Sequence, residues 1–258
     1  MTKEIEITSL GDLLDVVPVQ PHFTFNSVYR GVSDSNYPLL PSLFRLKPGT
    51  LSRLPFGSLE RQFITTFRAR CRPFYEFRED QILETLTLMQ HHGVPTRLLD
   101  WSESPLVAMY FALADLSEKA VSRDAAVWQI PSGPNNFSPR SVEELHDRTH
   151  LEFHTPAHLH PRVSAQRGVF TIHPFEYSSM ELPPPIDELI NNIRSPNVTV
   201  KYVIRAKNRI GIRLDLDKLG FTPYSVFPDL DGLAKDIVWD YEKNVRRSEF
   251  EPIRAYSS

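Results

Sequence analysis

An arginine between a tyrosine and a glycine is the first candidate for chemistry in this sequence. Residues 23–30 alternate as a strand does, and Tyr29-Arg30-Gly31 closes that strand. A guanidinium binds a phosphate or carboxylate through two parallel hydrogen bonds, and glycine lets a ligand or another backbone approach closely. The tripeptide therefore allows an anion site headed by Arg30, although taken alone it favours a structural ion pair. The alternative is that Arg30 pairs with a structural carboxylate such as Asp100, because buried charges are usually paired.

A second candidate region is residues 90–102, QHHGVPTRLLDWS, which joins the end of one expected helix to a short expected strand. It gathers donors, acceptors and titratable groups beside the most apolar helix of the chain: Gln90, His91, His92, Thr96, Arg97, Asp100, Trp101 and Ser102. An apolar surrounding shifts pKa values, as catalysis requires. We therefore favour a functional role for the stretch, and the alternative is a polar network that only fixes the strand.

Residues 162–170, RVSAQRGVF, form a third candidate region at the entrance of another expected strand. Gln166 and Arg167 could present an amide and a guanidinium to a ligand. The following glycine is equally typical of a β-bulge, which would give the stretch a purely structural role. The residues alone do not separate the two interpretations.

Histidines recur at His146, His150, His154, His158 and His160. A spacing of four places the first three on one helical face, which suits a metal ion. No carboxylate or cysteine completes such a site, and Pro156 interrupts the helix. We therefore expect a solvated face and predict no metal site.

Composition and absent motifs narrow the classes of protein. The 258 residues carry a formal net charge of −3, with 41% hydrophobic and 24% charged residues, so we expect a folded protein without nonspecific nucleic-acid binding. The sequence has no Gly-rich phosphate loop, GxSxG, HExxH or CxxC motif, which argues against P-loop ATPases, Rossmann dehydrogenases, α/β-hydrolases and zincins.

The longest apolar stretch, 106–114, is too short for a membrane span, and the N-terminus does not resemble a signal peptide. One cysteine, Cys71, allows no internal disulfide, so we expect a cytoplasmic protein without membrane contact.

The expected helices and strands interleave irregularly along the chain. Periodicity and capping signals predict a strand and short helix within 5–16, helices over 58–72, 82–92, 105–119, 142–151, 209–219 and 229–242, and strands over 23–30, 96–101, 125–130, 169–172 and 198–204. The helix from Pro105 is apolar nearly all round, so we expect it at the centre of the domain. The irregular order predicts an α+β fold, a single domain with a split or two-sheet β core around a cleft, surrounded by helices. We expect an N-terminal extension over 1–20, the domain over 21–245 and a C-terminal tail over 246–258, with 173–197 peripheral.

Several of these stretches resemble the FRG domain, a mainly bacterial family named for an aromatic-Arg-Gly tripeptide. Residues 29–31 match the name-giving motif, and residues 37–45, YPLLPSLFR, resemble its continuation. Residues 90–112 resemble the longest motif of the family, and 162–170 and 227–232 resemble later blocks. The resemblance covers most of the chain from about residue 28 to 240.

The order of these motifs is also similar to that of ADP-ribosyltransferase-like proteins. This similarity implies their fold and an enzyme that uses NAD, for ADP-ribosyl transfer to a protein or nucleic-acid acceptor or for NAD cleavage, in a bacterial toxin or phage-defence role. In that group a strand arginine contacts the NAD phosphates, a strand-ending serine shapes the nicotinamide pocket, and a later acidic or amide side chain acts near the ribose. Arg30, Ser102 and Gln166 match these positions. The chain departs from the pattern by reading Leu-Asp-Trp-Ser where the family has Ser-Thr-Ser.

The resemblance implies further roles around a bound small-molecule nucleotide. Asp100 would stabilise a cationic ribose or hold Arg30, and His92 would act as a base or bind ribose hydroxyls. Trp101 or Tyr110 would stack on a ring of the nucleotide. The remaining expected nucleotide-binding residues are Tyr29, Gly31, Arg97 and Arg167.

Two alternatives to an NAD-using enzyme stay open. The first is a non-catalytic module that binds a nucleotide or nucleic acid through Arg30, Arg97 and Arg167. The second is metal-dependent hydrolysis through His91, His92 and Asp100, which is disfavoured because adjacent histidines on a helix point in different directions.

Overall fold

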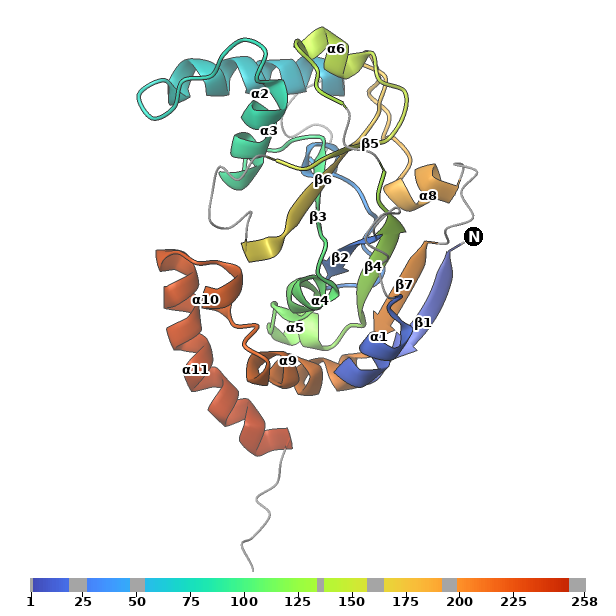
Figure 1. Ribbon diagram of the computed structural model, residues 1–258, viewed down its shortest axis with the longest axis vertical. Coiled ribbons are helices and arrows are strands. Elements are labelled where there is room, and N and C mark those ends of the chain that lie inside the picture. The colour runs from blue at the N-terminus through green and yellow to red at the C-terminus, as the bar shows by residue number, and fades with distance from the viewer. Residues whose placement is uncertain are drawn as a thin grey trace, which may run out of the picture.

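A seven-stranded sheet, in the order β1-β7-β4-β2-β3-β6-β5, forms the centre of the molecule (Figure 1). The computed structural model describes residues 2–18, 27–46, 54–133, 137–156, 165–191 and 199–250, with side chains up to residue 245 in the last range. The strands are β1 (Lys3–Ile7), β2 (Ser27–Val32), β3 (Leu98–Ser102), β4 (Ala125–Pro131), β5 (Glu152–His154), β6 (Gly168–Ile172) and β7 (Val200–Ile204). The helices are α1 (Leu10–Val16), α2 (Phe56–Cys71), α3 (Ile82–His91), α4 (Pro105–Leu113), α5 (Glu118–Val121), α6 (Val142–His146), α8 (Ile186–Asn191), α9 (Arg209–Lys218), α10 (Pro223–Val226) and α11 (Leu230–Phe250), with short 3₁₀ turns η1 (Ser42–Arg45) and η2 (Ala206–Asn208).

The sheet is mixed and nearly divided between β2 and β3. β1 pairs parallel to β7, and all other neighbours are antiparallel. β2 follows β4 over six residue pairs, whereas β2 and β3 share only the pair Tyr29–Ser102. The predicted α+β class is confirmed. The predicted split takes the form of a divergence between two strands of one sheet.

Helix α4 occupies the central position that its apolar sequence predicts, packed on β2. Gly31 makes this packing possible, because a Cβ there would overlap the carbonyl oxygen of Ala108 and lie 2.5 Å from the amide nitrogen of Ala112. The glycine of the tripeptide is therefore explained by the close approach of a helix backbone. The Ser104 side chain caps the helix through the amide of Val107, as expected.

The helices cover both faces of the sheet. α1, α4 and α9 pack against one face of the β1-β7-β4-β2 half, with Leu13, Met109 and Leu216 fully buried between them. The opposite face is covered by α8 and the chain around Leu39. α2, α3 and α6 pack around β3 and β6. The expected N-terminal extension adds β1 to the sheet and α1 to this core.

Several element boundaries differ from the predicted ones. α2 begins at Phe56, after Pro55, and not at a Ser58 cap. The predicted helix over 105–119 ends at Leu113, where Arg209 donates to the carbonyl oxygens of Ala112 and Asp115, and α5 begins anew after the Ser117 cap. α11 runs eight residues beyond the predicted end at Glu242, through the start of the expected tail, to Phe250. The expected boundary at residue 20 and residues 251–258 lie outside the described residues.

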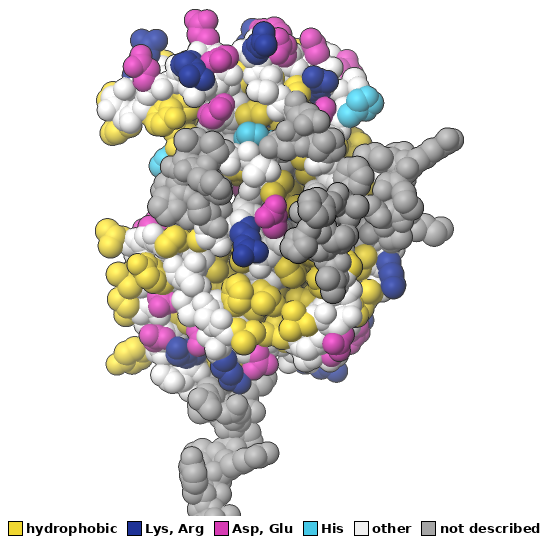
Figure 2. All heavy atoms as spheres, viewed as in Figure 1, with side chains coloured by type: hydrophobic (Ala, Val, Ile, Leu, Met, Phe, Trp, Pro, Cys, Tyr) yellow, Lys and Arg dark blue, Asp and Glu magenta, His cyan; other side chains and the backbone are white. Residues whose placement is uncertain are grey.

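Helices α10 and α11 form a projecting edge of the molecule (Figure 1). Figure 2 shows hydrophobic side chains along this edge, where Leu230, Ile237 and Tyr241 are exposed. Charged side chains of both signs gather at the opposite end, over α2 and α6. None of the described helices combines the length and apolar character that crossing a bilayer requires.

Candidate functional site

A cavity of about 810 Å³ lies where β2 and β3 diverge. Its volume is in the range of small-molecule sites, and its walls combine a few charged groups with many aromatic rings. Segments far apart in the sequence line it: Tyr29, Arg30 and Gly31 from β2; Tyr37 and Arg45 from the following loop and η1; Glu84, Gln90 and His91 from α3; Asp100, Trp101 and Ser102 from β3; Phe111 from α4; Gln166, Phe170 and Phe227.

Arg30 spans the gap between the diverging strands. Its Nη1 donates to the backbone carbonyl oxygen of Asp100 at 2.6 Å and lies 3.5 Å from the Asp100 carboxylate. The Arg30 side chain is 19% exposed and that of Asp100 is 56% exposed, so the pair opens onto the cavity. Burial lowers the pKa of Arg30 from its usual value; the Asp100 charge opposes this shift, and the charge of Arg45 adds to it. The guanidinium stays protonated, as an arginine does in proteins.

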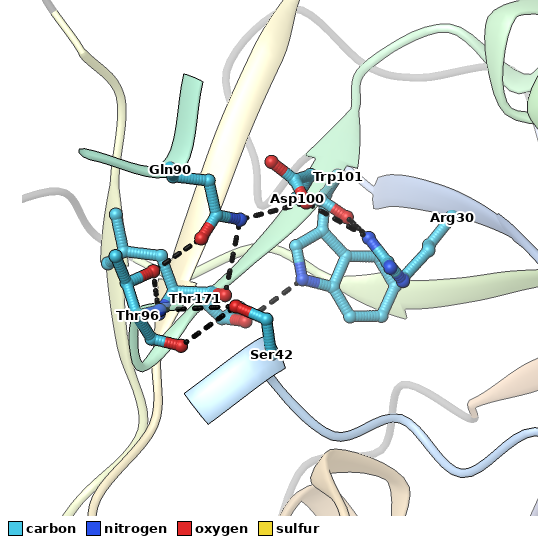
Figure 3. A network of polar contacts seen from close by, with 8 residues as sticks. Arg30, Ser42, Gln90, Thr96, Asp100, Trp101 and Thr171 are labelled. Atoms are coloured by element: carbon cyan, nitrogen blue, oxygen red, sulfur yellow. Dashed lines mark hydrogen bonds and ion pairs between the residues drawn. The ribbon is translucent and has the colours of Figure 1, made fainter. Parts of the chain in front are cut away.

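The Asp100 carboxylate belongs to a polar network that continues away from the cavity (Figure 3). Gln90 Nε2 donates to Asp100 Oδ2 at 2.9 Å and to the Leu98 carbonyl oxygen at 3.3 Å. The Thr96 hydroxyl donates to Gln90 Oε1, and the Thr96 amide donates to Ser42 Oγ at 3.1 Å. This network fixes β3, as the structural interpretation of residues 90–102 predicts, and it also holds the Asp100 carboxylate at the cavity. The functional interpretation stays a prediction.

Ser102 and Gln166 lie at the cavity as the resemblance implies, and the Ser102 hydroxyl and the Gln166 side-chain nitrogen form internal hydrogen bonds. The Ser102 hydroxyl donates to the Gln166 carbonyl oxygen at 2.6 Å and accepts from the Ser104 amide at 3.0 Å. Gln166 Nε2 donates to the Val226 carbonyl oxygen at 3.2 Å. These contacts shape the cavity wall. Of the two side chains expected to act near the ribose, Asp100 and Gln166, Asp100 is therefore the better placed.

Aromatic rings form much of the remaining wall. Phe111 and Phe227 meet edge to face at a centroid separation of 5.6 Å, and Tyr75 and Phe77 lie 4.4 Å apart on the segment before α3. Trp101 also lines the cavity, but it is 3% exposed and its Nε1 donates to Thr171 Oγ1 at 2.9 Å. A flat ring of a ligand would therefore find more accessible aromatic surface on the other four residues.

Arg97 does not reach the cavity, which corrects its expected role in nucleotide binding. Its guanidinium is fully buried against Glu60, with Nε 2.9 Å from both carboxylate oxygens, and it lies 4.2 Å from the Phe175 ring centre. Nη2 also contacts His146 Nδ1 at 2.7 Å. Burial, and next the charge of Arg97, lower the pKa of His146 to about 4. The arginine satisfies an internal carboxylate and carries a structural role.

Three further expected site residues also lie away from the cavity lining. The Arg213 guanidinium lies 4.9 Å from the centre of the Tyr110 ring. The neighbouring residue on α4, Phe111, lines the cavity in its place. His92 is exposed at the end of α3, whereas His91 lines the cavity. Arg167 is exposed and adopts a left-handed φ of 46°, so that its carbonyl oxygen accepts from the Glu103 amide.

The histidine series does not share a helix. α6 ends at His146, and His154 lies on β5. Within the described ranges, no three His, Cys, Asp or Glu side chains come together as a metal site. His158 and His160, as well as residues 162–164 of the third candidate region, lie outside the described residues.

Sequence reasoning did not assign Arg45 or Glu84 to the site, and it gave the role of base or ribose contact to His92, whereas His91 lines the cavity. Arg45 ends the YPLLPSLFR segment, and Glu84 lies one helical turn before Leu88, which also lines the cavity. The i, i+3 and i+7 spacing of Glu84, Thr87 and His91 was a usable signal, because these positions share one face of a helix.

Comparison with known families identifies one domain. Residues 25–120 match the model of the FRG domain, so the chain carries an FRG domain, as its motifs predict. The match includes β2, η1, α3, β3 and α4, which supply most of the cavity wall. No curated protein and no solved structure matches the chain.

Proposed function

We propose that the chain binds NAD in the cavity between β2 and β3 and cleaves its nicotinamide–ribose bond, as an ADP-ribosyltransferase-like enzyme. The observation that carries the proposal is the Arg30–Asp100 pair. A guanidinium suited to phosphate and a carboxylate suited to a developing cation lie side by side at the mouth of an aromatic-lined cavity. Its volume of about 810 Å³ is within the range of sites that enclose small ligands.

The reaction needs little from the protein beyond orientation and charge. The C1–N bond of the ribose breaks, nicotinamide leaves with the bonding electron pair, and positive charge develops on the ribose. The Asp100 carboxylate would stabilise that charge, as carboxylates do in glycoside hydrolysis. Water or an acceptor hydroxyl then bonds to C1 and releases its proton to solvent. Gln90 holds Asp100 in place from the side away from Arg30.

The acceptor and the biological role rest on the family resemblance. A protein or nucleic-acid acceptor, a cytoplasmic location and a role as a bacterial toxin or in phage defence are part of the proposal. All three depend on NAD use being demonstrated first.

A non-catalytic nucleotide-binding module is the second candidate function. It is favoured by one observation, that the Ser102 hydroxyl and the Gln166 side-chain nitrogen donate internal hydrogen bonds. Its nucleic-acid form is less well supported, because Arg97 is buried against Glu60 and Arg167 does not line the cavity.

Nicotinamide release distinguishes these functions. The full chain is incubated with NAD and the free base is quantified by chromatography, for the wild type, for Arg30→Ala and for Arg70→Gln as a control at an exposed arginine of α2. We expect release by the wild type and the control, and a loss of at least about tenfold in Arg30→Ala. Thermal unfolding checks that each variant folds. NAD binding without release or labelling would support the non-catalytic module, and no binding would refute both.

A further inference from the structure

Arg45, which ends η1, is a second guanidinium at the same cavity. It is exposed and forms no hydrogen bond or ion pair with any other described residue. Its positive charge contributes to the lowered pKa of Arg30, which places the two guanidiniums within electrostatic reach of each other. Among the described residues, Arg30 therefore has a carboxylate partner at the cavity and Arg45 has none.

The turn that carries Arg45 is firmly anchored. Leu43 and Phe44 are buried, and the Leu43 amide donates to the Thr96 carbonyl oxygen at 3.1 Å. Ser42 accepts from the Thr96 amide at 3.1 Å, which connects η1 to the network that ends at Asp100. The backbone of Arg45 is thus held at a set position relative to Arg30. Binding of an anion would therefore order the Arg45 side chain but not the backbone that carries it.

The carboxylates described in the cavity wall do not form ion pairs with both Arg30 and Arg45. Asp100 lies beside Arg30, and the other carboxylate of the lining, Glu84, is close enough to Arg68 to act on its charge. Two guanidiniums that repel each other are stabilised when a diphosphate places one phosphate group against each of them.

We propose that Arg30 and Arg45 together bind the two phosphates of a diphosphate, so that the site selects nucleoside diphosphates and their derivatives over monophosphates. This inference rests on the proposed nucleotide site and is independent of NAD cleavage. NAD and ADP-ribose both contain such a diphosphate. Arg45 would be a specificity-determining residue, because it contacts a phosphate that a nucleoside monophosphate lacks.

The test compares ADP with AMP by calorimetric titration of the full chain. We expect the wild type to bind ADP at least about tenfold more tightly than AMP, since a charge-assisted hydrogen bond contributes about 1.5–3 kcal/mol. In Arg45→Gln this preference should fall to about twofold or less, with AMP affinity nearly unchanged. Arg45→Lys should restore part of it, and Arg70→Gln should behave as the wild type.

The outcomes separate this inference from the proposed function. An unchanged ADP preference in Arg45→Gln, equal affinities in the wild type, or failure of both nucleotides to bind would overturn it. A wild type that prefers ADP through Arg45 but releases no nicotinamide would support the inference and contradict the enzyme. Because Arg45 contacts no described residue through a hydrogen bond or ion pair, its variants should unfold at the temperature of the wild type.

Discussion

The guanidinium of Arg30 lies 2.6 Å from the backbone carbonyl oxygen of Asp100 and 3.5 Å from its carboxylate. Among the strand pairs of the described residues, β2 and β3 alone share a single residue pair, and this contact bridges the gap between them. The arginine is thus a structural bridge and a cavity residue at once. The pairing with Asp100 that the tripeptide allows is observed, and the anion site headed by Arg30 stays a prediction.

The Gln90–Asp100 contact should be visible as coupling between two substitutions. Asp100→Asn should lower kcat for nicotinamide release by about 100-fold, because the amide cannot stabilise a developing cation. Gln90→Leu should lower kcat with little change in KM, since it releases Asp100 without touching the ligand phosphates. In the Asp100→Asn background the Gln90 substitution should have almost no further effect on kcat.

A second double-mutant cycle serves as the control and uses Gln166, whose side-chain nitrogen donates to the Val226 carbonyl oxygen. Gln166→Leu and Asp100→Asn should act additively on kcat. Additivity of the Gln90 and Asp100 substitutions, or strong coupling through Gln166, would show that Gln90 does not position the carboxylate.

Gly31→Ala should destabilise the protein by more than about 2 kcal/mol, because the added methyl group overlaps the backbone of α4. Chemical denaturation measures this loss. Gly211→Ala is the control, since nothing lies within 4 Å of a Cβ at that helical position. It should leave stability unchanged or raise it by about 0.5–1 kcal/mol. Similar unfolding midpoints for the two variants would contradict the close packing of α4 on β2.

Glu60→Gln should cost about 3–5 kcal/mol, because it leaves the Arg97 charge buried without its counter-ion. Arg61→Gln breaks the exposed ion pair with Glu143 and should cost less than about 1 kcal/mol. The free energy of unfolding of both variants decides the point. If Glu60→Gln costs no more than Arg61→Gln, Arg97 is not the structural ion-pair partner described here.

His173 should make stability depend on pH. Burial lowers its pKa from 6.5 to about 4, although a hydrogen bond to the backbone of Pro184 opposes this shift. Between these values the unfolded chain binds the proton and the folded protein does not. The free energy of unfolding therefore falls as pH drops through this window, by up to about 1.4 kcal/mol per pH unit for each such histidine. His146 and His154 act with the same sign.

His173→Phe should flatten that slope, since the replacement does not titrate. Denaturation between pH 4 and pH 7 measures the slope, and the exposed His150→Gln serves as the control. Parallel stability curves for the wild type and His173→Phe would refute a neutral buried histidine.

Local signals predicted the elements well where their causes are local. Gly93 and Gly220 adopt the positive φ values expected after helices, and Ser104 caps α4. The end of α4 was missed because Arg209, almost a hundred residues later, caps it. The strand β5 was not predicted, because it lies just after the helix expected over 142–151 and its pairing with β6 is not visible in the local sequence.

The candidate site was predictable as a set of segments but not residue by residue. Arg30, Asp100, Ser102 and Gln166 do meet at one cavity. Three features of the site depend on tertiary packing: Arg97 is buried against Glu60, Phe111 and not Tyr110 faces the cavity, and Arg45 lies at the cavity wall. The residue types alone do not predict these features, because an arginine or an aromatic residue can lie either in the core or at the cavity wall.

Calorimetric titration with NAD tests the central claim most directly, since it asks whether the cavity beside Arg30 binds a dinucleotide at all. We predict saturable binding to the wild type and an affinity at least about tenfold lower for Arg30→Gln, in a variant whose circular dichroism spectrum is unchanged. Equal affinity of the two proteins, or no binding to the wild type, would contradict the claim.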